Sequence, residues 1–215
     1  MHIESYQIIL IAIFLLVAFP VHEFFHAYAA YRLGDGTAKM FGRLTLNPIV
    51  HFDPLGGLLL VISVLSTGFM FGWAKPTPVN PSNLRDRRNS EVIVALAGPA
   101  SNLVMACLAA IVIRALNAIG VLEQLPTLAL DVLFYFVLFN ILLAIFNLIP
   151  IPPLDGSKVL FAFLDRRTEF QVRPILEQYG FFILIFLFFL PPGGSIGGRI
   201  FGPVLNAIFD FLVGG

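Results

Sequence analysis

The sequence predicts an all-α polytopic membrane protein, and its composition is the first observation that does so. Hydrophobic residues make up 58% of the 215 residues and charged residues 12%, with a mean hydropathy of +0.90. A soluble domain carries about 25% charged residues, so this chain lacks the polar surface that water requires. Its 13 Lys and Arg residues balance 13 Asp and Glu residues. This balance argues against a nucleic-acid partner and leaves the lipid bilayer as the expected surroundings.

Long uncharged stretches are the second observation, and they predict about five to six transmembrane helices. A helix needs roughly 20 apolar residues to cross the hydrocarbon core. Five stretches approach this length, between Glu4 and Glu23, Asp53 and Lys75, Glu91 and Arg114, Asp131 and Asp155, and Glu177 and Arg199. A sixth, Ile200 to Val213, is shorter and contains Asp210, so it crosses only if it tilts or the bilayer thins.

The segment after the first stretch predicts a small β-structure, and the single cysteine limits which side chains could bind a metal. Residues 35 to 53 mix β-branched and turn-forming types, which predicts a short hairpin after the first stretch. Cys107 stands alone in the sequence, so neither an internal disulfide nor a thiolate metal cluster can form. Any bound metal would therefore be held by His and carboxylate side chains.

The strongest functional signal is His22-Glu23-x-x-His26, an H-E-x-x-H pattern at the end of the first apolar stretch. Residues four apart share one helix face, so both imidazoles can reach one ion, and Glu23 can take a proton from a water held there. A carboxylate within a membrane helix costs about 2.5–3.5 kcal/mol on insertion scales, which favours a functional role over a packing one. The pattern predicts one Zn²⁺ ion and hydrolytic chemistry.

Two histidines leave a zinc site incomplete, because catalytic zinc generally has three protein ligands and an open position. Asp155 is the strongest candidate for the third ligand, since it follows a proline-rich helix end and Gly156 permits a tight turn that aims the carboxylate inward. An Asp at a helix end can also serve only as a cap. His51 is the rival ligand or a residue that lines the site, although a loop histidine is more often solvated.

Three motifs occur in one order along the chain: His22-Glu23-x-x-His26, Ala97-Gly98-Pro99-Ala100-Ser101-Asn102 and Asn147-x-x-Pro150-x-Pro152-x-Leu154-Asp155-Gly156. Together they cover about residues 6–165, and the chain resembles the site-2 protease family of intramembrane zinc metalloproteases, in its short form without a PDZ or CBS domain. The resemblance implies His22, His26 and Asp155 as zinc ligands and Glu23 as the general base. It also implies Asn102 and Asn147 as groups that hold substrate backbone or oxyanion, and a small β-element at Phe41 to Val50.

We therefore expect one integral membrane metalloprotease domain over residues 1–215, with a motif core at about 6–165 and a C-terminal helical hairpin at about 175–213. Its expected function is hydrolysis of peptide bonds in or near transmembrane segments of membrane-protein substrates. The alternative is a membrane metal or proton transporter that uses the same His and Asp side chains. A transporter has no need of a Glu beside the first histidine. The sequence does not indicate the oligomeric state.

The number of membrane crossings between the motifs and the distribution of charge predict on which side of the membrane the site lies. If every stretch crossed the bilayer, the ends of the first and fourth would emerge on opposite sides, and His22 and His26 could not share an ion with Asp155. A re-entrant segment at residues 55–72 brings both parts to one face and places eleven Lys and Arg residues there against two on the other. The positive-inside tendency then predicts a multi-pass protein of the cell membrane, with the site toward the cytoplasmic half and the N-terminus outside.

Overall fold

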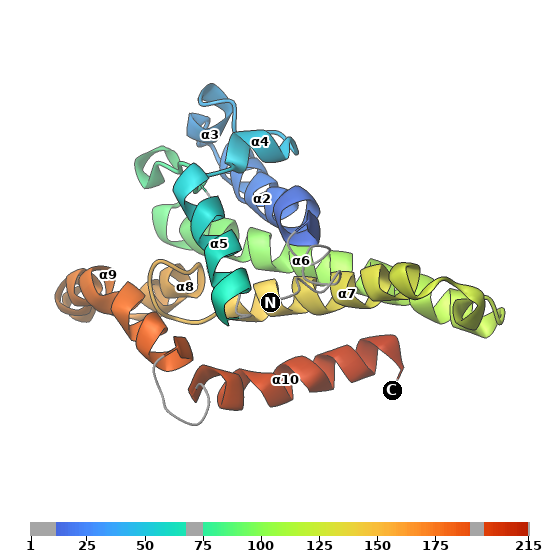
Figure 1. Ribbon diagram of the computed structural model, residues 1–215. Coiled ribbons are helices and arrows are strands. Elements are labelled where there is room, and N and C mark those ends of the chain that lie inside the picture. Colours follow the sequence, from blue (N-terminus) through green and yellow to red (C-terminus); the bar gives the residue numbers. More distant parts are fainter. Residues whose placement is uncertain (1–11, 68–74, 190–195, 215) are drawn as a thin grey trace.

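A long central helix organises the fold. The computed structural model describes residues 12–67, 75–189 and 196–214, and every regular element in these ranges is a helix, which confirms the all-α prediction. The central helix α6, Arg87–Ala118, contacts four others: α2 (Phe19–Arg32), α7 (Thr127–Asn147), α8 (Gly156–Phe163) and α10 (Ile196–Val213). Figure 1 shows α6 and α7 side by side, with α2 leaning on α6 and α10 running beneath α7.

Four helices in the described ranges are long and apolar enough to cross a membrane: α6, α7, α9 (Arg166–Phe189) and α10. Large apolar side chains cover their outer faces; on α6, for example, Leu108 is 59% exposed and Ile111 63% exposed. Such surfaces are stable against lipid rather than water. The chain is therefore a membrane protein, and the predicted sixth stretch lies within the 18-residue helix α10.

The first two predicted stretches contain shorter helices. Helix α2 has 14 residues and follows a short π-helix, Phe14–Ala18, and α5 (Pro54–Thr67) also has 14 residues. At 1.5 Å per residue, 14 residues span about 21 Å, less than the roughly 30 Å of a hydrocarbon core. Parts of both predicted stretches, residues 1–11 and 68–74, lie outside the described residues.

Small side chains allow α6 and α7 to pack closely. Ala106 and Ala110 on α6 are buried against Val137 and Ile141 of α7, and Ile113 completes this core. Small residues at such positions let helix backbones approach each other in membranes, where dispersion contacts replace the hydrophobic effect as the main attraction. The α6–α7 pair thus forms the rigid base on which the other helices lie.

Two arginine side chains of α6 bond to the C-terminal half of the chain, where the hairpin expected at about 175–213 stays a prediction. The Arg88 guanidinium donates to the Ala162 carbonyl just before α9, which places this end of α9 near the start of α6. At the other end of the pair, the Arg114 guanidinium donates to the Leu212 carbonyl near the end of α10. Helix α10 therefore ends beside the end of α6.

The predicted hairpin in residues 35 to 53, including the β-element at Phe41 to Val50, is wrong. This segment forms turns and two single-turn helices, α3 (Thr37–Met40) and α4 (Pro48–His51), with no strand in its described residues.

Side-chain hydrogen bonds explain this difference. The Asn47 side chain accepts from the Ile49 amide at 3.1 Å, and Pro48 has the backbone angle that a first helical turn needs. His51 Nε2 donates to the Thr45 carbonyl at 2.9 Å. The loop therefore satisfies its backbone groups through caps and side chains, and these local bonds prevail over the β-propensity of its branched residues.

Candidate metal centre

Three buried side chains direct one atom each at a common point. His22 and His26 come from α2, and Asp155 is the residue that precedes α8. The two Nε2 atoms are 3.0 Å apart, and Asp155 Oδ2 lies 3.2 Å from His22 Nε2 and 2.9 Å from His26 Nε2. None of the three residues is more than 8% exposed. The structure thus brings together the two motifs that the sequence predicted would share an ion.

This triangle has the dimensions of a zinc site. Zinc binds imidazole nitrogen at about 2.0–2.1 Å and carboxylate oxygen at about 2.0–2.2 Å, so adjacent ligand atoms of a tetrahedron lie about 3.3 Å apart. The observed separations of 2.9 to 3.2 Å are close to one face of such a tetrahedron. Two imidazoles and a carboxylate are also a ligand set of catalytic zinc, with the fourth vertex left for water or substrate. The residues present therefore fit this metal.

Helix α6 provides a hydrogen-bond acceptor for the Nδ1 atom of each imidazole. His22 Nδ1 donates to Asn102 Oδ1 at 2.6 Å, and His26 Nδ1 donates to the Val94 carbonyl at 2.7 Å. A carbonyl can only accept, so His26 carries its proton on Nδ1. The Nε2 lone pair of each ring then faces the centre, as in most metal-binding histidines.

Gly98 gives the two rings their space. A Cβ atom added at Gly98 would lie 2.3 Å from His26 Nε2 and 2.7 Å from His22 Cε1. No larger residue fits without moving the rings, because non-bonded heavy atoms pack at about 3.5 Å or more. Gly98 belongs to the second sequence motif, in which only Asn102 was predicted to have a role. A glycine in a helix interior, which costs about 0.5–1 kcal/mol relative to Ala, was the available signal.

A close backbone approach directs Asp155 toward the histidines. A Cβ atom added at Gly156 would lie 2.2 Å from the Leu148 carbonyl oxygen, so only glycine allows α8 to begin against the end of α7. While Asp155 Oδ2 faces the imidazoles, Oδ1 lies 3.3 Å from Lys158 Nζ. The carboxylate is therefore fixed at both oxygens, in the inward turn that the sequence predicted.

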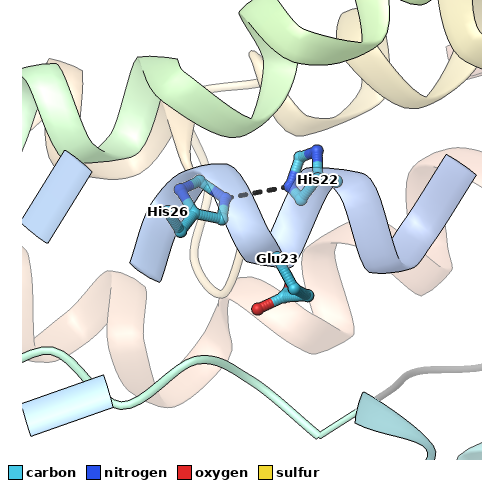
Figure 2. A group of neighbouring side chains, drawn as sticks. All are labelled: His22, Glu23 and His26. Atoms are coloured by element: carbon cyan, nitrogen blue, oxygen red, sulfur yellow. Dashed lines mark hydrogen bonds between the residues drawn. The ribbon is translucent and has the colours of Figure 1, made fainter. Parts of the chain in front are cut away.

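Glu23 lies beside the triangle. Its carboxylate comes within 4.8 Å of the imidazole nitrogens, and Figure 2 shows its side chain leaving the helix on a different side from the two rings. The Thr77 amide donates to Glu23 Oε2 at 2.8 Å, and the Thr77 hydroxyl donates to the Glu23 carbonyl at 3.1 Å. Two hydrogen bonds from Thr77 thus hold Glu23 beside the triangle.

Asp35 anchors the non-helical segment 75–80 that carries Thr77. The fully buried Asp35 carboxylate accepts from the Asn80 amide at 2.7 Å and from Asn83 Nδ2 at 2.9 Å. Burial alone would raise the pKa of Asp35, but these hydrogen bonds and those from Thr37 prevail and lower its pKa. Neither Asp35 nor Thr77 belongs to a motif, so the sequence predicts no role for either residue.

The remaining predicted site residues lie outside the triangle. His51 is 1% exposed, and its Nδ1 has no hydrogen-bond partner among the described residues. Asn147 is half-buried and donates through Nδ2 to the Leu143 carbonyl at 2.9 Å. Its contact with substrate stays a prediction. Asn102 is fully buried behind His22 and donates to Asn140 Oδ1 at 2.9 Å. Asn140 was not among the predicted site residues, although a carboxamide inside an uncharged stretch is a signal of such a role.

The fold and the site define a class: an intramembrane zinc metalloprotease, in which membrane helices enclose an H-E-x-x-H pair and a distant carboxylate. The chain belongs to peptidase family M50, the site-2 protease family, whose profile matches residues 9–188. YwhC of Bacillus subtilis, named as a zinc metalloprotease, is 38% identical over 206 residues, which cover 94% of this chain and 89% of YwhC. Rip2 of Mycolicibacterium smegmatis, named likewise, is 31% identical over 205 residues, which cover 91% of this chain and 71% of Rip2. No solved structure gives a significant match.

These comparisons confirm the predicted class of enzyme. The chain is an intramembrane zinc metalloprotease, and zinc is its cofactor. Its protein substrates lie in the membrane. The transporter alternative is not favoured.

Proposed function

We propose that His22, His26 and Asp155 are the zinc ligands and that Glu23 is the general base of peptide-bond hydrolysis. The observation that carries this proposal is the convergence of the three ligand atoms within 2.9 to 3.2 Å. Asp155 takes precedence over His51 as third ligand because its Oδ2 contacts both imidazoles, whereas His51 donates to the Thr45 carbonyl.

The chain's own residues move the protons of this reaction. Zinc, when bound, supplies Lewis acidity that polarises the scissile carbonyl and acidifies water. The Glu23 carboxylate accepts a proton from the attacking water and later donates it to the nitrogen of the leaving amine. The Thr77 amide holds Oε2 of that carboxylate, which fixes where the proton is taken up. A positioned base of this kind contributes about 10²–10⁴-fold to the rate.

Replacement of the base by its amide tests this assignment. Glu23→Gln keeps the shape of the side chain but removes its basicity, so cleavage of a reconstituted transmembrane peptide falls by at least about 10²-fold while zinc content stays at one ion per chain. Wild-type protein treated with a chelator is the matched control, since it loses activity and metal together and regains both with added zinc. Cleavage by Glu23→Gln within threefold of wild type would contradict the general-base role.

The substrate backbone must be extended near the zinc, because a helix hides its carbonyls in its own hydrogen bonds. With no strand at residues 41–50, the non-helical segment 75–80 beside Glu23 is the surface where an unwound substrate can lie alongside the protein. Lys75 and Pro76 are exposed on this segment. We assign cleavage to bonds in or near the transmembrane segments of membrane-protein substrates.

The proposed topology keeps the re-entrant segment and rests on one hydrogen bond. The His51 carbonyl accepts from the Lys75 amide at 2.9 Å, so the two ends of residues 52–74 lie together. A segment that crossed the bilayer would have its ends about 30 Å apart. We place five helices, α2, α6, α7, α9 and α10, in the cell membrane. The site then faces the cytoplasmic half and the N-terminus lies outside.

Cysteine labelling tests this topology. In a Cys107→Ser background, cysteines beside Arg43, Arg87 and Lys158 should react with a membrane-impermeant thiol reagent from the cytoplasmic side only. A cysteine beside Glu123 should react from the outer side and serves as the matched control for reagent access. Labelling of the Arg43 and Arg87 neighbours from different sides would refute the re-entrant segment.

A further inference from the structure

A buried row of carboxamides connects His22 to α7. Asn102 on α6 and Asn140 on α7 are both fully buried. His22 Nδ1 lies 2.6 Å from Asn102 Oδ1, Asn102 Nδ2 lies 2.9 Å from Asn140 Oδ1, and Asn140 Nδ2 lies 2.9 Å from the Phe136 carbonyl. Three helices thus contribute to a single chain of hydrogen bonds that ends at a predicted zinc ligand.

The carbonyl at the far end determines the direction of every bond in the chain. The Phe136 carbonyl can only accept, so the nitrogen of Asn140 faces it and the oxygen of Asn140 faces Asn102. Asn102 must then present its nitrogen to Asn140, and that nitrogen also donates to the Ala18 carbonyl at 3.3 Å. The oxygen of Asn102 therefore faces His22, whose Nδ1 carries the proton and whose Nε2 keeps its lone pair for the metal.

We propose that Asn140 is a positioning residue for zinc binding, acting through Asn102 on His22. This inference rests on the proposed function, because it takes His22 as a zinc ligand. Asn140 bonds to Asn102 and to the Phe136 carbonyl, and it keeps the Asn102 carboxamide in the one orientation that accepts from His22. Because both carboxamides are fully buried, this control is strong: a flipped Asn102 would place its NH₂ group against a ring N–H and leave donors unsatisfied.

The experiment compares zinc affinity with helix-packing stability. Asn140→Leu removes the acceptor for Asn102 at nearly constant volume, and Val137→Ala, fully buried on the same helix, damages packing alone. We expect Asn140→Leu to weaken zinc binding at least fivefold in chelator competition, whereas Val137→Ala lowers the thermal midpoint and leaves zinc affinity within twofold. Asn102→Leu should weaken binding by about 10–100-fold, as losses of direct partners of metal ligands do.

A double variant distinguishes action through Asn102 from an independent effect. Asn102→Leu/Asn140→Leu should bind zinc as Asn102→Leu does, because Asn140 has nothing left to orient. Additive losses would overturn the proposal, and so would an Asn140→Leu zinc affinity within twofold of wild type. If Asn140→Leu does not fold, Asn140→Asp replaces it, since a buried neutral carboxylic acid offers one donor and one acceptor and should retain zinc affinity within threefold. Wild type that binds no zinc would refute the proposed function itself.

Discussion

Replacement of Gly98 by alanine tests the close contact between α6 and the candidate zinc ligands. The new Cβ atom would lie 2.3 Å from His26 Nε2, 2.6 Å from His26 Cε1 and 2.7 Å from His22 Cε1. Ordinary contacts are about 3.5 Å, so the His26 ring must retreat by about 1 Å or α6 must move away from α2. Zinc sites tolerate about 0.2 Å in bond length, and a 1 Å displacement near reacting groups costs about 10²-fold. We therefore expect zinc affinity and kcat/KM each to fall by at least about 100-fold.

The assay for Gly98→Ala measures zinc by chelator competition and cleavage with a reconstituted transmembrane peptide. Gly202→Ala is the matched control, because Gly202 is also a helical glycine and its added Cβ would meet nothing within 4 Å. Alanine favours a helix over glycine by about 1 kcal/mol, so this control should be neutral or slightly stabilising. Zinc affinity of Gly98→Ala within threefold of wild type would refute the argument that this glycine keeps the rings in place.

Two further predictions concern ligand identity and the segment beside Glu23. Asp155→Ala should lose both zinc and activity, whereas His51→Ala should keep most of its zinc; metal analysis of the two purified variants decides, and the reverse pattern would refute the ligand assignment. Asp35→Asn should lower stability by about 1–3 kcal/mol, because an amide nitrogen would face hydrogen-bond donors. Since the pKa of Asp35 is lowered in the folded protein, this loss should be full at neutral pH and shrink as pH falls below about 3.9. A pH-independent difference in thermal midpoint would contradict that cause.

The candidate ligands could be predicted because their positions follow from local rules. His22 and His26 share a helix face through the 3.6-residue period, whatever packs against that helix. Asp155 could be predicted because the prolines before it end one helix and Gly156 after it begins another. This short connection restricts where the carboxylate can point. Lipid also restricts the fold to helices where the backbone is surrounded by hydrocarbon, so composition alone indicated the all-α class.

The features that could not be predicted depend on which helices meet. Gly98 and Asn140 matter only because α6 lies against both α2 and α7, and no spacing rule in one segment reveals such a pairing. Thr77 reaches Glu23 across 54 residues of sequence. The prediction of a β-element was wrong for a different reason. The cap at Asn47 and the bond from His51 to Thr45 are local interactions that compete with the strand propensity of the same residues. Composition alone does not determine which of the two prevails.

The register between α2 and α6 explains why one helix can orient both histidines. Val94, Gly98 and Asn102 are spaced by four residues, so they form one stripe on α6, just as His22 and His26 form one stripe on α2. The stripes run antiparallel: Asn102 holds His22, Val94 holds His26, and Gly98 lies against both rings. A shift of α6 by one residue would rotate all three positions by about 100° and remove both Nδ1 partners at once. The geometry of the zinc site is therefore a property of helix packing as much as of the H-E-x-x-H sequence.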